Sequence, residues 1–164
     1  MECYGAIDEL ISHIGFARSI CADAEVAAAL KAIQLELFKV GSAIGTAPES
    51  RKPAPEITAG MIGVLDDHVA RIEGVEGILG DWSLPGELPD ASAIDVARTV
   101  CRRAERLAVG LSEAGLISNP SILVYLNRLS DVLWLFGRLL EVRAKVDSSL
   151  RTKDAGGPRW SRAW

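Results

Sequence analysis

Residues 93–111 read AIDVARTVCRRAERLAVGL, which predicts an amphipathic helix. On a helical wheel of about 100° per residue, the apolar side chains fall within one wedge of roughly 100° that we expect to face a core. This wedge holds Ala97, Val100, Cys101, Ala104, Ala108 and Leu111. A separate wedge is charged and holds Arg98, Arg102, Glu105 and Arg106, with Arg103 just beyond it. The stretch therefore predicts a bundle helix that carries a dense cationic stripe.

Helical spacing of apolar residues continues on both sides of this stretch. We expect its helix to begin near Asp90 or Ser92 and to end near Gly115. The other expected helices run from near Ile7 to about Ala22, from Ala24 to about Thr46, from Thr58 as N-cap to about Ile72, and from Asn119 as N-cap to roughly Val146. With no strand signal, five helices predict an all-α five-helix bundle.

Two further segments complete the predicted organisation of the chain. Glycines and prolines between Gly74 and Pro89 mark a loop of about a dozen residues, a length that is often functional. Residues 1–147 are expected to form the bundle domain, and residues 148–164 a C-terminal tail that is loosely ordered from Asp147 onward. Trp160 and Trp164 in this tail would be costly to leave in water unless they dock.

Length and composition describe one soluble globular domain. The chain has 164 residues, of which 49% are hydrophobic and 24% charged, and a formal net charge of −4. At this length a single core buries enough surface to hold the fold, so collagen-like, disulfide-framework and disordered classes are excluded. The acidic balance argues against a general nucleic-acid partner, because neutralising phosphates needs an excess of Lys and Arg.

The cysteines, histidines and termini predict no metal or membrane role. Cys3, Cys21 and Cys101 are widely spaced, so no zinc site is expected. His13 and His68 have no ligand-spaced neighbours and are interpreted as ordinary surface or core residues. No apolar run reaches the roughly 18–20 residues of a membrane span, and the N-terminus does not resemble an export signal. We therefore expect a cytoplasmic protein with no membrane partner.

The cationic stripe has two interpretations. It could be a solvated helix face supported by neighbouring charges, or an anion-binding surface. Arg102 and Arg106, one turn apart, repel each other unless an anion or a carboxylate compensates. Guanidinium groups suit phosphate or carboxylate recognition, which keeps the second interpretation open.

Polar residues at two other positions raise a similar question. Asn127, Ser130 and Asp131 interrupt an otherwise apolar helix and need hydrogen-bond partners. They could fix the bundle through an interhelical network or contact a ligand. Asp8 could be a helix-dipole partner or the anion that pairs with one of the arginines.

Three strings of this sequence resemble the PduO-type ATP:cob(I)alamin adenosyltransferases. They are YGAIDEL at 4–10, ARTVCRRAER at 97–106, which is the most specific, and YLNRLSD at 125–131. They occur in the family's order with similar separations, and the resemblance covers about residues 2–146. It implies a five-helix bundle assembled as a homotrimer, with active sites in the clefts between subunits.

The resemblance also implies a reaction and its nucleotide site. Cobalt(I) of reduced cobalamin attacks the 5′ carbon of ATP, expelling triphosphate and forming adenosylcobalamin. Mg²⁺ sits on the triphosphate, and a flavoprotein reductase is a candidate partner. Arg102 would contact the phosphates as a catalytic residue, Asn127 would contact the nucleotide, and Glu105 would order that site.

The corrinoid site implied by the resemblance uses three other residues. Asp8 and Arg98 would form a cross-subunit salt bridge beside the corrin ring and count as catalytic. Trp82 aligns with a family Phe whose apolar ring helps to exclude the lower axial ligand, which makes cobalt(II) easier to reduce.

The sequence departs from the family pattern at several points. The family's N-terminal Thr/Gly/Asp-rich, triphosphate-wrapping stretch would lie before Met1, a family glycine is replaced by Glu87, and a family histidine by Asp95. Either added carboxylate would oppose ATP if it faced the site. These departures have three explanations: a start codon assigned too late, a divergent active enzyme, or a relic without catalysis.

Three functions follow from these observations. The first is an ATP-dependent corrinoid adenosyltransferase, and the second is a catalytically degenerate relative that binds or senses a corrinoid without ATP turnover. The third is a purely structural helical oligomer, for which polar residues on two helices would be costly without benefit.

Overall fold

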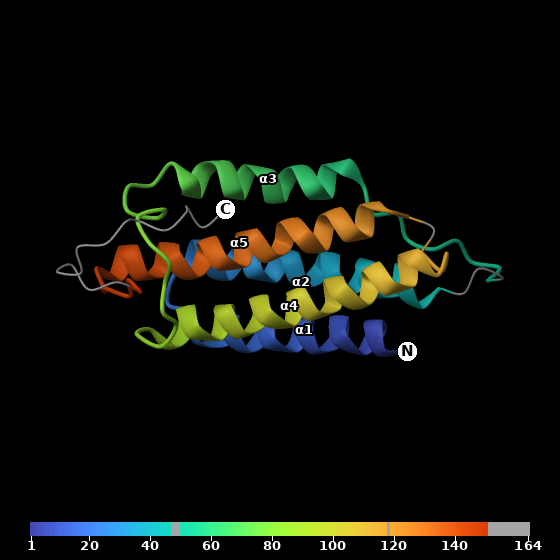
Figure 1. Ribbon diagram of the computed structural model, residues 1–164, viewed down its shortest axis with the longest axis horizontal. Coiled ribbons are helices and arrows are strands. Elements are labelled where there is room, and N and C mark those ends of the chain that lie inside the picture. The colour runs from blue at the N-terminus through green and yellow to red at the C-terminus, as the bar shows by residue number, and fades with distance from the viewer. Residues whose placement is uncertain (47–49, 118, 151–164) are drawn as a thin grey trace.

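The computed structural model describes residues 1–46, 50–117 and 119–150, in which the chain forms five helices. They are α1 (Glu2–Ile20), α2 (Ala24–Gly45), α3 (Ala59–Glu73), α4 (Pro89–Glu113) and α5 (Ser121–Ala144). This architecture confirms the all-α five-helix bundle expected from the sequence (Figure 1). None of these helices is both long and apolar enough to span a bilayer. Trp160 and Trp164 lie outside the described residues.

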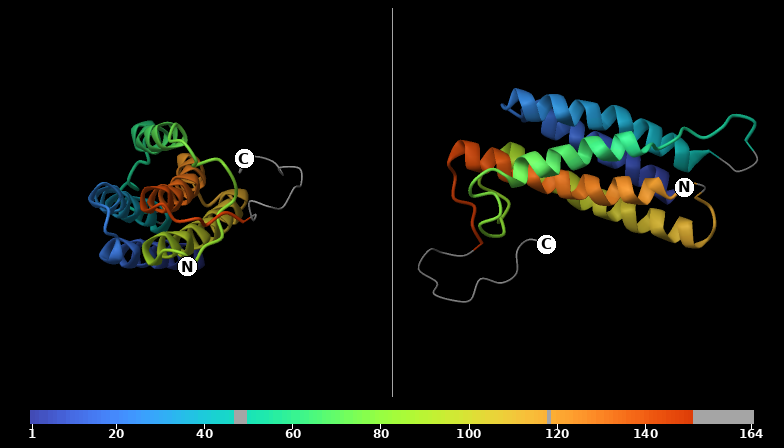
Figure 2. Two further views of the ribbon diagram at one scale, coloured as in Figure 1. Left: turned by 90° about the vertical axis from the view of Figure 1, so that its left-hand side faces the viewer. Right: turned by 90° about the horizontal axis from the view of Figure 1, so that it is seen from above.

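The last helix, α5, lies at the centre of the bundle. It packs against α4 and α3, while α1 packs against α4 and α2. Figures 1 and 2 show α3 and α4 on opposite sides of α5. Because neighbours cover most of α5, the polar side chains on its buried faces need hydrogen-bond partners.

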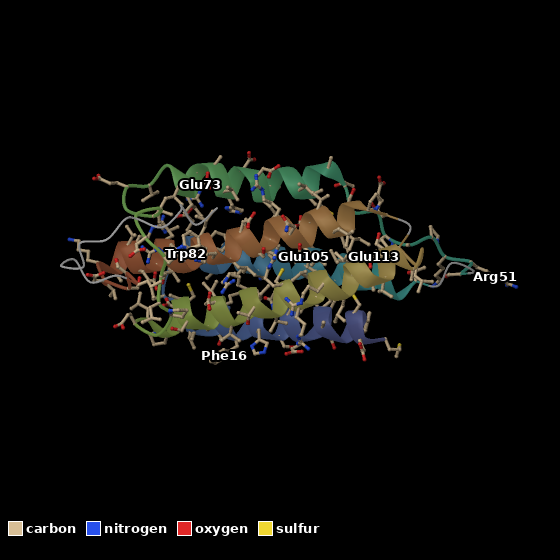
Figure 3. All side chains as sticks on the ribbon, viewed as in Figure 1. Phe16, Arg51, Glu73, Trp82, Glu105 and Glu113 are labelled. Atoms are coloured by element: carbon tan, nitrogen blue, oxygen red, sulfur yellow. The ribbon has the colours of Figure 1, made fainter. Side chains whose placement is uncertain are left out.

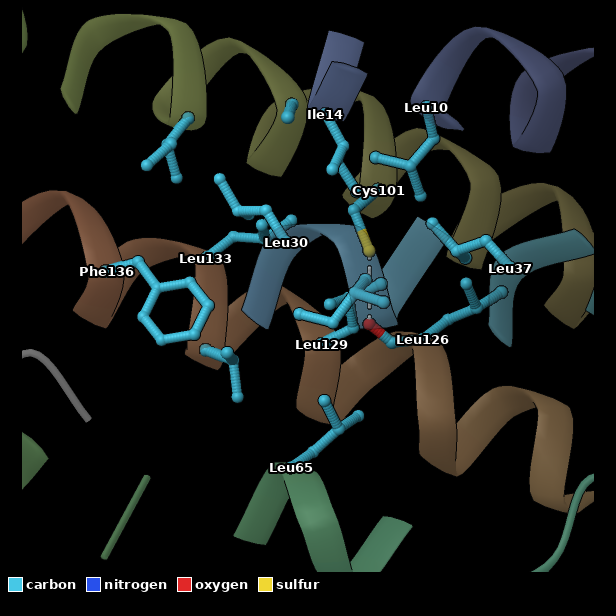
Figure 4. Close-up of a cluster of buried hydrophobic side chains, with 14 of the residues drawn as sticks. Leu10, Ile14, Leu30, Leu37, Leu65, Cys101, Leu126, Leu129, Leu133 and Phe136 are labelled. Carbon is cyan, nitrogen blue, oxygen red and sulfur yellow. Dashed lines mark hydrogen bonds between the residues drawn. The ribbon is translucent and has the colours of Figure 1, made fainter. Parts of the chain in front are cut away.

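The predicted apolar stripe of α4 faces the core. Ala97, Cys101, Ala104 and Ala108 are fully buried, and Leu111 packs at the edge of the core. Figure 4 shows Cys101 among leucines of α1, α2 and α5, where its thiol donates a hydrogen bond to a backbone carbonyl of α5 at 3.3 Å. Burial raises the pKa of this thiol well above its usual range, so it behaves as a small core residue.

Capping side chains set the starts of two helices, α2 and α3. Asp23 accepts hydrogen bonds from the Glu25 and Val26 N–H groups, each at 3.0 Å, and so caps α2. The hydroxyl of Thr58 accepts one from the Met61 N–H at 3.3 Å, which confirms the predicted N-cap of α3.

Two predicted helix starts differ from the structure. The first helix begins at Glu2 instead of near Ile7, because Cys3 and Ala6 also face the core. Asn119 was the expected N-cap of α5, but the cap position is Pro120. The Asn119 side chain accepts a hydrogen bond from the Ser121 N–H at 2.9 Å, so it holds the turn just before the helix.

The chain beyond α5 folds back onto the loop that joins α3 to α4. Residues 148–150, the C-terminal strap, pair with residues 82–84 through an isolated antiparallel bridge between Ser83 and Ser149. The Leu84 N–H donates to the Ser148 carbonyl at 2.7 Å, and the Leu150 N–H donates to the Trp82 carbonyl at 2.9 Å. This pairing corrects, for residues 148–150, the expectation of a loosely ordered chain after Asp147.

Candidate active site

A three-residue polar cluster joins the middle of α4 to α5. The Arg102 guanidinium donates to Glu105 Oε2 at 2.6 Å, and the Asn127 amide donates to Glu105 Oε1 at 2.8 Å. Figure 3 shows Glu105 near the middle of α4. The Glu105 side chain is 14% exposed and Arg102 is 46% exposed. Glu105 therefore uses both oxygens to fix two neighbours, while Arg102 keeps donors that face solvent.

This cluster brings together the three residues assigned to the nucleotide by the sequence. Arg102 and Glu105 are neighbours because they lie three residues apart on one face of α4. Asn127 reaches them because α4 and α5 pack along their lengths. A carboxylate thus compensates Arg102, as the repulsion argument required, and the exposed side of the guanidinium has the geometry for binding an anion.

The other cationic residues of α4 find separate partners. Arg103 pairs with Glu9 of α1. Arg106 donates to the backbone carbonyl of Arg102 at 3.2 Å. Part of the stripe is therefore a solvated, ion-paired helix face, and Arg102 differs from it in being tied to α5 through Glu105.

Arg98 lies one turn before Arg102, and its partner was not expected. Its Nε donates to Asp95 Oδ1 at 2.7 Å, and both side chains are half-buried. Asp95 is therefore the ion-pair partner of Arg98. It also lines a small cavity together with Arg138. Glu87, the other added acid, is exposed on the loop before α4.

Within residues 1–46, 50–117 and 119–150 of one chain, no ion pair joins Asp8 to Arg98, which pairs with Asp95 instead. Asp8 is exposed on α1 and lines a shallow groove with Phe38, Gly41 and Ser42 of α2. The family resemblance implies that Asp8 and Arg98 pair across two subunits, which a single chain does not test. The cross-subunit salt bridge stays a prediction.

Trp82 lies on the loop before α4, at the end of the bundle where α5 finishes (Figure 3). Its ring packs edge-to-face on Trp134 of α5, with centroids 6.3 Å apart and planes at 72°. The residue is 39% exposed, so part of the indole faces outward. An apolar ring held in this way can serve as one wall of a ligand site.

The polar residues of α5 bond partly within the helix and partly to α3. Ser130 donates to the Asn127 carbonyl at 2.7 Å. Arg128 donates to Asp66 of α3 at 2.5 Å and to Asp131 at 3.5 Å. Burial raises the pKa of Asp131, and Arg128 offsets only part of that effect. Asn127 bonds to α4 through Glu105, and Asp131 is linked to α3 through Arg128, whereas Ser130 bonds within its own helix. A ligand contact for Asn127 stays a prediction.

Sequence reasoning missed a largely buried cluster of four polar side chains at the loop that carries Trp82. Arg138 and Glu141 form an ion pair at 2.6 Å with 7% and 4% of their side chains exposed. Ser83 and Ser148 complete the group. Two charged residues within the strongly apolar stretch 132–142 were a signal that could have identified it.

The sequence of this chain is similar to those of several known proteins. Residues 1–140 match a family model described as cobalamin adenosyltransferase. A cobalamin adenosyltransferase of Cupriavidus metallidurans is 37% identical over 137 residues, covering 83% of this chain and 71% of that protein. A corrinoid adenosyltransferase of Bacillus subtilis is 33% identical over 150 residues, covering 89% and 76% respectively.

The fold is similar to that of solved structures. A variant of the PduO-type ATP:corrinoid adenosyltransferase from Lactobacillus reuteri, complexed with cobalamin and ATP, superposes with a TM-score of 0.84. It is 28% identical in sequence, and the match covers 92% of this chain and 82% of that one. Both the sequence and the arrangement of helices therefore match proteins of one kind.

Proposed function

Because this chain belongs to the cobalamin adenosyltransferase family, we propose that it transfers the 5′-deoxyadenosyl group of ATP to cob(I)alamin and releases triphosphate. The observation that carries this proposal is the cluster of Arg102, Glu105 and Asn127, which leaves a half-exposed guanidinium for a polyanion. The balanced step forms a cobalt–carbon bond with the cobalt(I) electron pair. The 5′ carbon–oxygen bond breaks, and its electron pair leaves with triphosphate.

The nucleotide end of this site neutralises and orients. Arg102 contacts the triphosphate, whose negative charge grows as it leaves, so the guanidinium favours the transition state over bound ATP. Glu105 holds the Arg102 side chain from behind, so that little rotamer freedom remains to be lost when ATP binds. Asn127, fixed by the same carboxylate, contacts the nucleotide.

The corrinoid end of the site needs a second copy of the chain. In the proposed homotrimer, Asp8 of one protomer pairs with Arg98 of the next, beside the corrin ring. Asp95 engages the Nε of Arg98, which leaves its terminal nitrogens for this contact. Phe38, which borders the same groove as Asp8, is 58% exposed. An exposed phenylalanine beside the proposed salt bridge suits an interface between subunits.

Mg²⁺ enters this proposal together with ATP. No three His, Cys, Asp or Glu side chains among residues 1–46, 50–117 and 119–150 lie close enough to hold a metal ion of their own. Phosphate oxygens bind Mg²⁺ readily, so the ion would arrive on the triphosphate. Mg²⁺ and Arg102 would then both neutralise the negative charge of the triphosphate. A flavoprotein reductase as electron donor and a cytoplasmic location are further parts of the proposal.

One observation favours the second candidate function, corrinoid binding without ATP turnover. Asp95 adds a carboxylate at 2.7 Å from Arg98, where the family has a histidine by resemblance. This charge would act at the corrinoid end and leave the nucleotide cluster intact. A protein of this kind would bind cobalamin and still fail to adenosylate it.

The test is turnover by the purified full-length chain. Chemically reduced cob(I)alamin and ATP with Mg²⁺ are mixed without oxygen, and adenosylcobalamin and triphosphate are quantified together. The proposal predicts equal amounts of the two products. Corrinoid binding with neither product would favour the second function, and binding of neither substrate would contradict both.

A further inference from the structure

The buried ion pair of Arg138 and Glu141 lies beneath the loop that carries Trp82. From this arrangement we infer that Arg138, Glu141, Ser83 and Ser148 are positioning residues, which hold the Trp82 indole at the corrinoid end of the site. This inference rests on the proposed function, because it assigns Trp82 to the corrinoid. It concerns residues that neither the motifs nor the cationic stripe includes.

Burying this ion pair costs free energy, which the pairing and further hydrogen bonds must offset. Arg138 is 6% and Glu141 3% exposed, and burying two charges removes them from water at a large desolvation penalty. They are three residues apart on α5, so the ion pair by itself joins no second element of the fold. Their remaining hydrogen bonds both leave the helix, toward the loop and toward the C-terminal strap.

The loop side of the network reaches the residue next to Trp82. The Ser83 hydroxyl lies 2.9 Å from Glu141 Oε1 and 3.0 Å from Oε2, and it donates to this carboxylate. On the other side, the Leu150 N–H donates to the Trp82 carbonyl at 2.9 Å. The backbone at Trp82 is therefore held from two directions, which fixes where its indole can lie.

The strap side of the network is anchored by the same guanidinium. Arg138 donates to the Ser148 hydroxyl at 2.6 Å through the nitrogen that also contacts Glu141. Ser148 is 4% exposed, and its carbonyl accepts from the Leu84 N–H at 2.7 Å. One buried charged pair thus ties α5, the loop and the strap together below the ring.

The network also approaches Arg98. A cavity of about 20 Å³ is lined by Ser83, Asp95 and Arg138, among others, which is room for one water molecule. Asp95 is the carboxylate that holds Arg98. The Nε of Arg138 is buried without a partner in the described part of the chain, so a water there would have a donor to accept from. Residues that hold Trp82 and the residue that holds Arg98 therefore line the same cavity. Trp82 and Arg98 are the two proposed corrinoid residues of this protomer.

The test removes single hydroxyl groups from the full-length chain. Ser83→Ala deletes the donor to Glu141, and Ser83→Thr keeps a hydroxyl in an extended segment that tolerates a β-branched residue. Ser149→Ala is the matched control, because Ser149 is the bridge partner of Ser83 in the C-terminal strap and is exposed. KM for cob(I)alamin and for ATP, together with the near-ultraviolet circular dichroism of the tryptophans, are measured for each variant.

We expect Ser83→Ala to raise the KM for cob(I)alamin about tenfold, the equivalent of losing one hydrogen bond to a charged group. The KM for ATP should stay unchanged, the tryptophan dichroism should weaken, and Ser83→Thr should restore both properties. Equal losses for the two substrates, or no change in either, would overturn the inference while leaving the proposed function intact. A wild-type chain that binds no corrinoid would instead contradict the proposed function itself.

Discussion

Replacing Arg102 by alanine tests the nucleotide site most selectively. A hydrogen bond to a charged group contributes about 1.5–3 kcal/mol, and a guanidinium fork can donate two to a triphosphate. The Arg102 side chain is 46% exposed, so solvent screening reduces this contribution. A net loss of about 2–3 kcal/mol corresponds to a rise of about 30- to 150-fold in the Kd for ATP.

The structure adds a second consequence of the same substitution. Without Arg102, Glu105 keeps its hydrogen bond from Asn127 but loses its cation. A like-charge contact at about 4 Å costs about 1 kcal/mol in a water-like dielectric. Arg102→Ala/Glu105→Gln should therefore bind ATP about fivefold more tightly than Arg102→Ala alone.

Isothermal titration with ATP and Mg²⁺ measures these constants, and circular dichroism checks that each variant folds. Arg106→Ala is the matched control, because it removes the same charge one turn further along α4. We expect Arg106→Ala to weaken ATP binding less than about threefold, since long-range charge is screened by salt. Equal effects of Arg102→Ala and Arg106→Ala would refute the assigned contact and leave only the general charge of the helix.

Three further results are expected. Arg98→Ala should raise the KM for cob(I)alamin at least about tenfold and leave the KM for ATP nearly unchanged, because a cross-subunit ion pair is lost; equal changes in steady-state assays would contradict its role. Mixing refolded Asp8→Ala and Arg98→Ala chains should restore part of the activity that each lacks, because some interfaces then carry both native residues; no recovery would argue against a shared site. Asp23→Ala should cost about 1 kcal/mol in urea unfolding, the value of an N-cap, and Asp23→Asn less, because asparagine also caps. Partial burial raises the Asp23 pKa, but hydrogen bonds from the Val26 N–H and Arg143 outweigh it, so the net pKa is lowered. The advantage of wild type over Asp23→Asn should thus be present at neutral pH and fade as the pH falls below the ordinary aspartate value of 3.8; an advantage that grows in acid would contradict this sign.

The fold could be predicted from local patterns because helices are local structures. The spacing of Ala97, Cys101, Ala104 and Ala108 predicts the buried face of α4, and all four are fully buried in the structure. Helix boundaries were less certain, since small residues such as Cys3 give a weak periodic signal. The C-terminal strap was missed because it depends on backbone pairing between segments more than 60 residues apart, which no side-chain pattern encodes.

The candidate site could likewise be predicted from the sequence only in part. Arg102 and Glu105 are neighbours on one helix, and Asn127 reaches Glu105 across the α4–α5 contact, so the motif and the bundle together located them. Asp95 was expected to oppose ATP if it faced the site, and instead it pairs with Arg98. The partner of Asp8 depends on a second protomer, which the periodicity of one chain does not specify.

Sequence reasoning also missed the buried ion pair of α5 and the loops that it contacts. Arg138 and Glu141 are separated by a helical turn within an apolar stretch, which is the signature of a buried pair. Their partners Ser83 and Ser148 come from segments that look like ordinary loop in the sequence. Buried charges in an apolar helix are therefore worth tracing to the loops that they hold.

A crystal structure of the full-length chain with ATP and Mg²⁺ would test the central claim most directly. The account predicts triphosphate oxygens within hydrogen-bond distance of the Arg102 guanidinium, with Glu105 still bound to Arg102 and Asn127 in contact with the nucleotide. ATP bound elsewhere, or an Arg102 that faces bulk solvent while the nucleotide is present, would contradict it.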